Sequence, residues 1–204
     1  MRLLPYGEQA VLVEADEDEQ PLTFAAALAA AAAPGIAEIV PAARTVLVRF
    51  VPGHERPDIA TLLTHSSGPG GDVLGTAHRL PVKLPVRYTG ADLHQLAEDL
   101  AMSANELVQR HANAEYTVAF CGFAPGFAYL TGLDRALWAP RLAEPRTAVP
   151  AGSVGIAGEY TGVYPRSSPG GWRLIGQTDA TLWDTHADPP ATLTPGRTVR
   201  FVPT

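Results

Sequence analysis

Short apolar runs alternate with one alanine-rich segment in the first part of the chain, a pattern typical of a small α/β unit. The run Val11-Leu12-Val13 predicts a strand, and residues 21–33 predict a helix. Pro21 suits a first helical turn, and Pro34-Gly35 ends the helical pattern. Further elements are expected as strands at 36–40, 45–51 and 82–86, a helix at 58–64 and a flexible glycine-rich loop at 66–71. Two β-rich halves with a helix each predict a ferredoxin-like α/β sandwich.

The pattern changes in the second part, where two helices precede a long β-rich region. Asp92 is expected to cap a helix whose apolar face consists of Leu93, Leu96, Ala97 and Leu100. The capping-box spacing of Ser103-Ala104-Asn105-Glu106 predicts a second helix that ends near His111. Strands are expected at 117–120, 153–157, 172–175, 180–183 and 198–202. Short strands separated by Gly/Pro turns predict a closed or nearly closed β-barrel. The fold class is therefore α+β, with domains at 1–84 and 85–204.

Composition and charge narrow the class of protein. The chain has 204 residues, 46% of them hydrophobic and 18% charged, which is typical of a soluble globular protein. A net charge of -6 argues against a nucleic-acid partner. A single cysteine, Cys121, fits a reducing compartment, and no apolar run reaches the ~20 residues of a membrane span. We therefore expect a cytoplasmic protein with no membrane association.

Three segments combine glycine, proline and aromatic residues at high density: 122–130, 149–158 and 168–172. Such segments make shaped loops, and three of them together favour a binding cleft over ordinary turns of an all-β domain. The candidate substrate-binding residues are Phe123, Pro125, Gly126, Phe127, Tyr129, Pro150, Ser153, Tyr164, Ser168, Gly170, Gly171 and Trp172. The glycine amides beside Ser153 and Ser168 are candidates for an anion nest. For Trp172, plain core packing is the alternative.

Two residues are candidates for chemistry. His111 is expected at a helix end, where it either interacts with the helix dipole or acts as an acid, base or substrate contact facing the 122–130 loop. Arg146 follows a proline and offers a planar fork for a carboxylate or phosphate, with a solvated surface position as the alternative. Arg141 also follows a proline and is the weaker candidate. Cys121 is expected to be a small buried side chain rather than a nucleophile.

Metal and nucleotide signatures do not appear in the sequence. The other histidines, His54, His65, His78, His94 and His186, lack metal-ligand spacing, so we expect no zinc site. Neither common glycine-rich nucleotide loop occurs.

The sequence resembles the family of the 5-oxoprolinase B subunit, also called allophanate hydrolase subunit 1, which includes the sporulation-kinase inhibitor KipI. The motifs that carry the resemblance are Tyr6-Gly7-Glu8, Pro85-Val86-Arg87-Tyr88, residues 107–111, 122–130 and 145–146, residues 149–158, 161–165 and 168–172, Ile175-Gly176 and Pro195-Gly196.

The resemblance implies a cyclophilin-like barrel in the second domain and assembly with two partners, the paralogous C subunit and the A subunit of the same complex. It implies a non-autonomous component that takes part in ATP-dependent opening of 5-oxoproline to glutamate. A KipI-like kinase inhibitor and the carboxyltransferase half of a urea carboxylase are the alternatives within the same resemblance. The family commonly has arginine where this chain has Gln177, and this difference removes one expected anion contact. The family also commonly has aspartate where this chain has Arg197.

Overall fold

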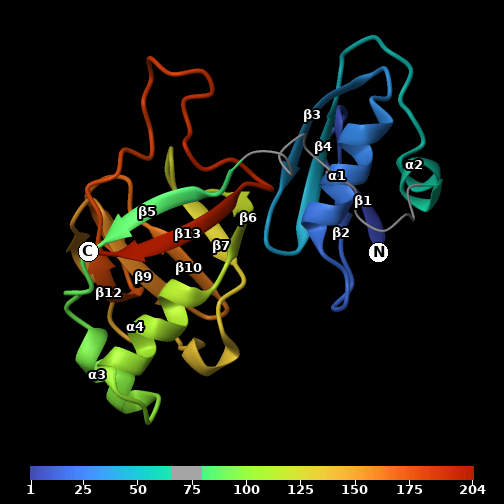
Figure 1. The fold of residues 1–204 in the computed structure, drawn as a ribbon. Helices are drawn as coiled ribbons and strands as arrows, with labels where there is room; N and C mark the ends of the chain where they lie inside the picture. Colours follow the sequence, from blue (N-terminus) through green and yellow to red (C-terminus); the bar gives the residue numbers. More distant parts are fainter. Residues whose placement is uncertain (66–79) are drawn as a thin grey trace. The chain divides into compact units, whose positions relative to one another are not determined.

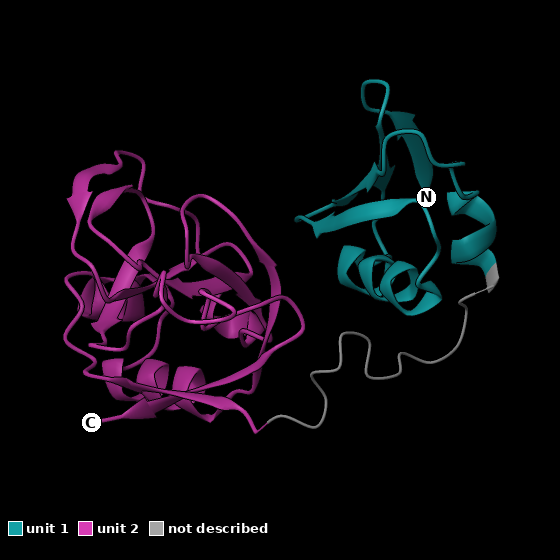
Figure 2. Ribbon diagram, turned by 90° about the horizontal axis from the view of Figure 1, so that it is seen from above, with its two compact units in different colours: residues 1–79 teal, residues 80–204 magenta. Residues whose placement is uncertain are grey.

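The computed structural model describes residues 1–65 and 80–204, which fall into two compact units, Met1–Arg79 and Leu80–Thr204 (Figure 2). The expected boundary after residue 84 differs from this division, because it falls inside strand β5 (Val82–Val86). β5 pairs along its length with β13 (Thr198–Pro203) of the second unit. The loop expected at 66–71 lies outside the described residues.

The first unit is a four-stranded antiparallel sheet with the order β1-β2-β4-β3 (Figure 1). Its elements are β1 (Arg2–Pro5), β2 (Ala10–Glu14), α1 (Pro21–Ala31), β3 (Ile36–Pro41), β4 (Thr45–Phe50) and α2 (Ile59–His65). β4 lies between β2 and β3, which α1 connects, so these elements form the split βαβ arrangement of a ferredoxin-like sandwich. The sequence pattern did not predict β1, which occupies the edge beside β2.

One face of this sheet forms the core of the first unit. Alternate residues of β2 and β4 contribute Val13, Val46, Val48 and Phe50, and α1 contributes Ala25 and Leu28. The helix begins at Pro21 as expected and ends two residues early, since Ala32 adopts a left-handed conformation with φ of 44°. Burial along β4 has a period of two, as expected for a strand with one face in a core, although its sequence is a nearly continuous apolar run.

The second unit contains a seven-stranded sheet with the order β12-β9-β10-β7-β6-β13-β5. Its strands are β5, β6 (Tyr116–Cys121), β7 (Ala128–Thr131), β9 (Ser153–Ala157), β10 (Tyr160–Val163), β12 (Arg173–Gln177) and β13. A short pair, β8 (Arg146–Val149) and β11 (Ser168–Gly170), lies beside them. The helical segments are α3 (Leu93–Asp99), α4 (Ala104–Asn113) and the 3₁₀ turn η1 (Arg135–Leu137).

The two edge strands of this sheet meet and close it into a barrel. Arg87 and Gln177 exchange two backbone hydrogen bonds, each 2.9 Å long. The seam continues where Gly90 N–H donates to the carbonyl of Ile175 at 3.1 Å. A Cβ atom at Gly90 would lie 2.3 Å from backbone atoms of Leu174 and Ile175 in β12, so glycine permits the close approach. The barrel predicted from the sequence is confirmed.

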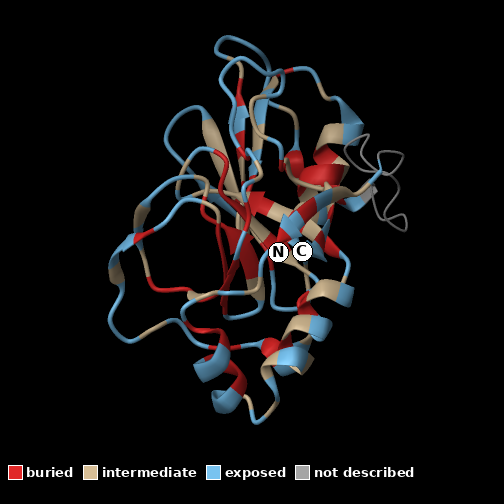
Figure 3. Ribbon diagram, turned by 60° about the vertical axis from the view of Figure 1, so that its left-hand side comes forward, coloured by how far each residue is buried: buried red, intermediate tan, exposed pale blue. Residues whose placement is uncertain are grey.

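The barrel core and the two helices account for most of the remaining burial. Apolar residues of the strands, among them Leu84, Val118, Leu130, Ile156 and Phe201, form one cluster with Leu96 of α3 and Leu107 of α4. Figure 3 shows buried residues on the inner strands and exposed residues on the outer sides of both helices. This amphipathic pattern is the one that the sequence predicted for α3.

Two local expectations for this unit are wrong. Residues 180–183 do not form a strand, since Trp183 makes only an isolated bridge to Ala191. Asp92 precedes α3 but does not cap it, because its side chain binds elsewhere. The Ser103 cap is confirmed, as its hydroxyl accepts a hydrogen bond from the Glu106 amide at 3.1 Å.

Candidate functional site

The three segments rich in glycine and aromatic residues meet around a cluster of rings in the barrel unit. Phe127 lies at its centre, with ring centroids 5.1 Å from Tyr129 and 5.3 Å from Phe123, Tyr164 and Trp172. Edge-to-face contacts at these distances stabilise a packed cluster. Phe127, Tyr164 and Trp172 are buried, with exposed fractions of 1%, 2% and 4%. These three rings therefore form a second core rather than the walls of an open cleft.

Glycines in and next to these segments provide room for the rings. A Cβ atom at Gly162, on the neighbouring strand β10, would lie 3.1 Å from the Trp172 ring, and one at Gly170 would lie 2.3 Å from the Tyr164 hydroxyl oxygen. A Cβ atom at Gly152 would lie 2.1 Å from the carbonyl oxygen of Thr178. Close packing therefore explains much of the glycine content that suggested a cleft. Ser153 is likewise buried, so its side chain does not face solvent.

Phe123 is the aromatic residue of this cluster that faces solvent. It is 59% exposed and has a φ of 67°, a conformation that is uncommon for a bulky residue. Its ring contacts Phe127 and lies 6.2 Å from the ring of Tyr164. Backbone strain of this kind is often found at functional sites. Pro125 is exposed and Gly126 is buried in the same loop.

Arg146 is held in place by Asp92. The Arg146 Nη2 atom donates to Asp92 Oδ1 at 2.7 Å, and Asp92 Oδ2 accepts from the Leu174 amide at 2.7 Å. The aspartate expected to cap a helix thus links β8 to β12. The Nη1 atom of Arg146 is buried and makes no hydrogen bond, whereas the side chain as a whole is 29% exposed.

The hydroxyl of Tyr164 lies close to the backbone segments of Arg146 and Arg141. Gly170, which lies against this hydroxyl, pairs with Arg146, and Leu142, next to Arg141, donates to the Gly171 carbonyl at 2.7 Å. Burial raises the pKa of Tyr164, while the Trp172 amide and the guanidinium groups of Arg141 and Arg146 act in the opposite direction. Both arginines therefore lie near this phenol, although the sequence had favoured Arg146 over Arg141. Ser168, on the strand that pairs with β8, has a buried hydroxyl without a partner.

We call Arg141, Arg146, Tyr164, Ser168 and Phe123 the Tyr164 site. It combines two guanidinium groups, unused polar atoms and one exposed aromatic face. Such a set suits a small anionic molecule with a flat ring. The sequence signal for it was the repeated Pro-Arg dipeptide, whereas the contribution of Asp92 depends on a contact between residues far apart in the chain.

Other predicted residues surround this site less directly. Tyr129 is partly buried, Pro150 is exposed and Gly171 is buried. A Cβ atom at Gly171 would meet only ordinary contacts, the nearest at 3.6 Å, and the residue has no positive φ. Gly170 rather than Gly171 is therefore the position that requires glycine.

His111 does not lie at the Tyr164 site. Its side chain is fully buried and packs against Tyr116 and Phe201. Thr161 donates its hydroxyl proton to the Gly155 carbonyl, so its oxygen accepts from His111 Nε2 at 2.9 Å. Nδ1 then accepts from the Tyr88 hydroxyl at 2.8 Å. Burial lowers the pKa of His111 to about 3, so the ring is neutral and structural rather than in contact with substrate.

Cys121 is also unsuited to catalysis. Its thiol is partly buried and donates to the carbonyl of Leu193 at 3.3 Å. Burial raises the pKa of Cys121 to about 11, which disfavours the reactive thiolate.

Two surface grooves of the barrel unit lie away from these residues. One, of roughly 680 Å³, runs along the polar side of α4 and reaches Asp134. The other, of roughly 420 Å³, lies between Trp138 and Tyr160. Neither is lined by Phe123 or Arg146, so the expected cleft is not one of these grooves. Within residues 1–65 and 80–204, no cluster of three metal-binding side chains occurs and no helix is long and apolar enough to cross a membrane.

Comparison with known proteins assigns the family. Residues 1–193 match the family described as "Carboxyltransferase domain, subdomain C and D", and the chain belongs to it. It is 51% identical over 125 residues to the 5-oxoprolinase B subunit of Escherichia coli O157:H7, a match that covers 60% of this chain and 57% of that protein. It is 47% identical over 128 residues to the 5-oxoprolinase B subunit of Bacillus subtilis, covering 61% and 53%. The family resemblance seen in the sequence is confirmed, and the matches span little more than half the length of these relatives.

Solved structures share the fold. TTHA0988 is 34% identical with a TM-score of 0.77, and the match covers 96% of this chain and 40% of that one. The uncharacterized protein PH0987 from Pyrococcus horikoshii is 33% identical with a TM-score of 0.60, and the match covers 100% and 97%. The urea amidolyase of K. lactis is 21% identical with a TM-score of 0.69, covering 99% of this chain and 15% of that enzyme, a likeness that concerns the fold alone.

Proposed function

We propose that this chain is one component of an ATP-dependent 5-oxoprolinase complex that opens 5-oxoproline to glutamate. The proposal rests on the similarity to relatives named as the B subunit of 5-oxoprolinase. The observation that carries it in the structure is the convergence of the segments of Arg141, Arg146 and Tyr164 beside exposed Phe123. Arg146 pairs with Gly170, which lies against the Tyr164 hydroxyl, and Leu142, next to Arg141, donates to the Gly171 carbonyl at 2.7 Å. In this proposal the substrate carboxylate binds the guanidinium groups and its flat ring lies against Phe123.

The chemistry fits a site without a nucleophile. A lactam amide is a poor electrophile, and phosphorylation of its oxygen turns that oxygen into a leaving group. Such a reaction requires positioning and neutralisation of charge more than a protein nucleophile. The neutral, buried His111 and the protonated Cys121 are consistent with this requirement.

The same proposal places ATP mainly on other components of the complex. Gly126, Gly152 and Gly170 pack closely against side chains and carbonyl groups, and the sequence contains neither common glycine-rich nucleotide loop. We assign this chain the recognition of the small acid, in the cytoplasm, within a complex that also contains the A and C subunits. In this proposal the chain contributes to the activity of the complex and has no enzymatic activity by itself.

Reconstitution tests the assignment. The isolated chain is expected to leave 5-oxoproline unchanged in the presence of ATP, whereas the chain mixed with the A and C subunits should release glutamate. Turnover by the isolated chain at ~1 per second or faster would contradict the non-autonomous role. A complex that leaves 5-oxoproline unchanged but carboxylates urea in the presence of carboxybiotin would instead indicate the carboxyltransferase alternative. Inhibition of a histidine kinase by the isolated chain would indicate the KipI-like one.

Substitutions in that complex test the site itself. Arg146→Ala should lower kcat/KM about ten- to a hundredfold, because a charge-assisted contact of ~1.5–3 kcal/mol is lost. Arg141→Ala should have a measurable effect as well, since it also lies near Tyr164. Arg173→Ala is the control, because Arg173 pairs with Asp99 instead. Activity that is unchanged in both site variants would exclude the Tyr164 site.

A further inference from the structure

The groove between Trp138 and Tyr160 is a second candidate binding site on the barrel unit. Trp138, Ala139 and Pro140 line one side, and Gly158, Glu159 and Tyr160 line the other, around a volume of roughly 420 Å³. It therefore has two aromatic walls, a stiff proline and a charged side chain. We call it the Trp138 groove.

Both sides of the groove are held in fixed positions. The indole Nε1 of Trp138 donates to the Leu133 carbonyl at 3.2 Å. The Gly158 amide donates to the Ala139 carbonyl at 2.7 Å and joins the two sides. Tyr160 packs edge-to-face against Phe120 and Tyr129, with ring centroids 5.6 and 5.7 Å apart. Such anchoring lowers the entropy cost of binding a ligand between the walls.

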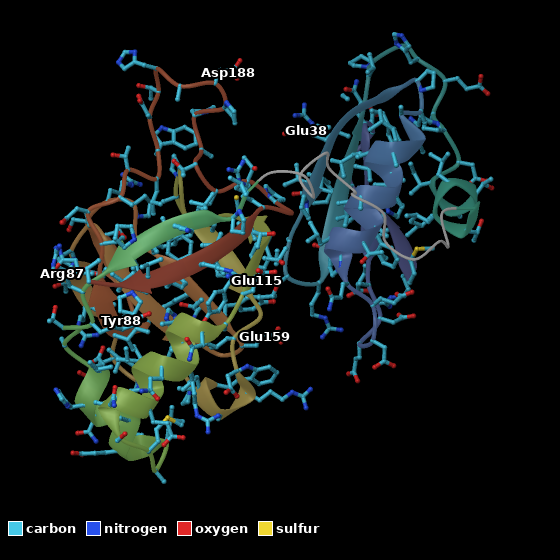
Figure 4. All side chains as sticks on the ribbon, viewed as in Figure 1. Glu38, Arg87, Tyr88, Glu115, Glu159 and Asp188 are labelled. Carbon is cyan, nitrogen blue, oxygen red and sulfur yellow. The ribbon has the colours of Figure 1, made fainter. Side chains whose placement is uncertain are left out.

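The charged residue that lines the groove is negative. Glu159 is exposed at the periphery of the barrel unit (Figure 4), and among the described residues no cation forms an ion pair with it. Glu159 and Tyr160 are adjacent in the lining of the groove, and burial and the Glu159 carboxylate raise the pKa of Tyr160 to about 12. The charge therefore lies beside the aromatic wall.

The indole of Trp138 already accepts a guanidinium. The Arg135 guanidinium carbon lies 5.3 Å from the ring centroid, which is a cation–π distance. Arg135 itself does not line the groove. One wall of the groove is thus an indole that makes a cation–π contact with a guanidinium outside the groove, and the groove itself adds a negatively charged carboxylate.

We propose that the Trp138 groove binds an arginine side chain of a partner protein, with the guanidinium against Trp138 and Tyr160 and hydrogen-bonded to Glu159. A planar guanidinium both stacks on an aromatic ring and matches a carboxylate in a bidentate way, which an ammonium does not. The charge complementarity selects a basic segment, and the exposed position of Trp138 and Glu159 suits a side chain that projects from another surface. This site is independent of the proposed lactam chemistry.

Binding of a single-arginine peptide to the full chain tests the proposal. The probe is the acetylated and amidated pentapeptide Gly-Ser-Arg-Ser-Gly, and the control replaces arginine with the neutral isostere citrulline. The NMR signal of the Trp138 indole N–H, assigned by its loss in Trp138→Phe, should shift saturably with the arginine peptide only. Glu159→Gln should weaken this binding about three- to tenfold. Glu98→Gln removes the same charge from α3, and Trp183→Ala removes another exposed indole, so both should bind as the parent chain does.

Several results would overturn the proposal. Equal shifts with the citrulline peptide would show that the guanidinium charge does not contribute to binding. Unchanged affinity in Glu159→Gln would show that the Glu159 carboxylate does not contribute. Tighter binding of choline than of the arginine peptide would assign the groove to a small cation instead. Absence of any saturable shift at tens of millimolar peptide would mean that the groove does not bind an arginine side chain. Glu159→Gln changes an exposed side chain, so the test does not depend on the folding of a Trp138 variant.

Discussion

At the scale of single residues, burial decides which side chains contribute to stability and which remain available to a ligand. His111 and Phe127 looked like site residues in the sequence, yet both are buried. Phe123 and Arg146 retain an exposed ring and an unused donor, respectively. The identity of a residue therefore indicated the chemistry that was possible, and the packing around it determined whether that chemistry is accessible.

The buried His111 should make stability depend on pH. Its pKa in the folded state, about 3, lies below the ordinary value near 6.5, so the unfolded chain binds more protons between these values. Stability should be complete above about pH 6.5 and should fall by about 1.4 kcal/mol per unit as the pH decreases toward 3. Urea unfolding at pH 7, 6 and 5 measures this slope. His111→Gln should flatten it and the exposed His94→Gln should leave it unchanged, whereas equal slopes in all three chains would contradict the role of His111.

Gly170 and Gly171 should respond differently to the same substitution. Gly170→Ala places a Cβ atom 2.3 Å from the Tyr164 hydroxyl oxygen, so a buried ring must move. We expect a loss of about 1–3 kcal/mol in the free energy of unfolding. Gly171→Ala makes only ordinary contacts and should change stability by less than about 0.5 kcal/mol. Thermal unfolding of the two variants makes the comparison, and equal losses would mean that the constraint is not the Tyr164 ring.

At the scale of elements, side chains at helix ends either complete their own helix or connect it to the barrel. Ser103 caps α4 locally. Asp92 lies in the equivalent place before α3 but binds the Leu174 amide and Arg146. The two positions look alike in sequence because aspartate and serine are both common cap residues. The choice depends on whether an unpaired amide of another strand lies within reach.

This difference predicts unequal effects on stability. Ser103→Ala should cost about 1 kcal/mol, the usual value for a lost cap. Asp92→Ala should cost about 2–4 kcal/mol, since a buried amide and a partly buried guanidinium lose their partner. All three tryptophans lie in the second unit, so tryptophan fluorescence during urea unfolding reports on that unit. An Asp92→Ala chain as stable as Ser103→Ala would contradict the bridging role of Asp92.

At the scale of the whole molecule, each unit has a core built from its own residues. The clusters around Val13 and around Leu84 contain no residue of the other unit among the described parts of the chain. β5 belongs entirely to the second unit because it closes the barrel with β13 and β12. The barrel unit therefore begins before residue 82 rather than at residue 85.

Two fragments test where the barrel unit begins. Residues 80–204 should fold alone, with a dispersed NMR spectrum and a cooperative thermal transition. Residues 85–204 lack Leu84, a fully buried core residue, and the strand pairs of Val82 and Lys83 with β13. We expect this shorter fragment to unfold at least about 5 °C lower, or to remain unfolded. Equal transition temperatures would mean that β5 contributes little to barrel closure.

The surface around Phe123 is expected to contact the C subunit of the proposed complex. An exposed aromatic ring of this size is typical of interfaces. Phe123→Asp should reduce co-purification with the C subunit while the free chain stays folded. Tyr6→Asp changes an equally exposed aromatic residue of the first unit and is the control. Phe127→Asp, in contrast, should unfold the barrel because it buries a charge. Unchanged co-purification of Phe123→Asp would place the interface elsewhere.

The sequence by itself determined the order of most elements, the α+β class and the family. These features depend on local information: the β-branched run at residues 45–51, the helical spacing after Asp92 and the glycine-proline motifs are all readable along the chain. Short strands such as β7 and β11 were not predicted, since four or fewer residues carry too little pattern.

Only the tertiary structure decided which of these residues form a site. The glycine-aromatic segments are equally consistent with a cleft or a core, and the close approach of Gly162 and Gly170 to the rings shows that they form a core. The pairing of Asp92 with Arg146 and the approach of Arg141 to Tyr164 join positions far apart in the chain. Burial, pKa and charge neighbourhood are properties of the surroundings of a residue, and those surroundings come from strand pairings that no local pattern contains.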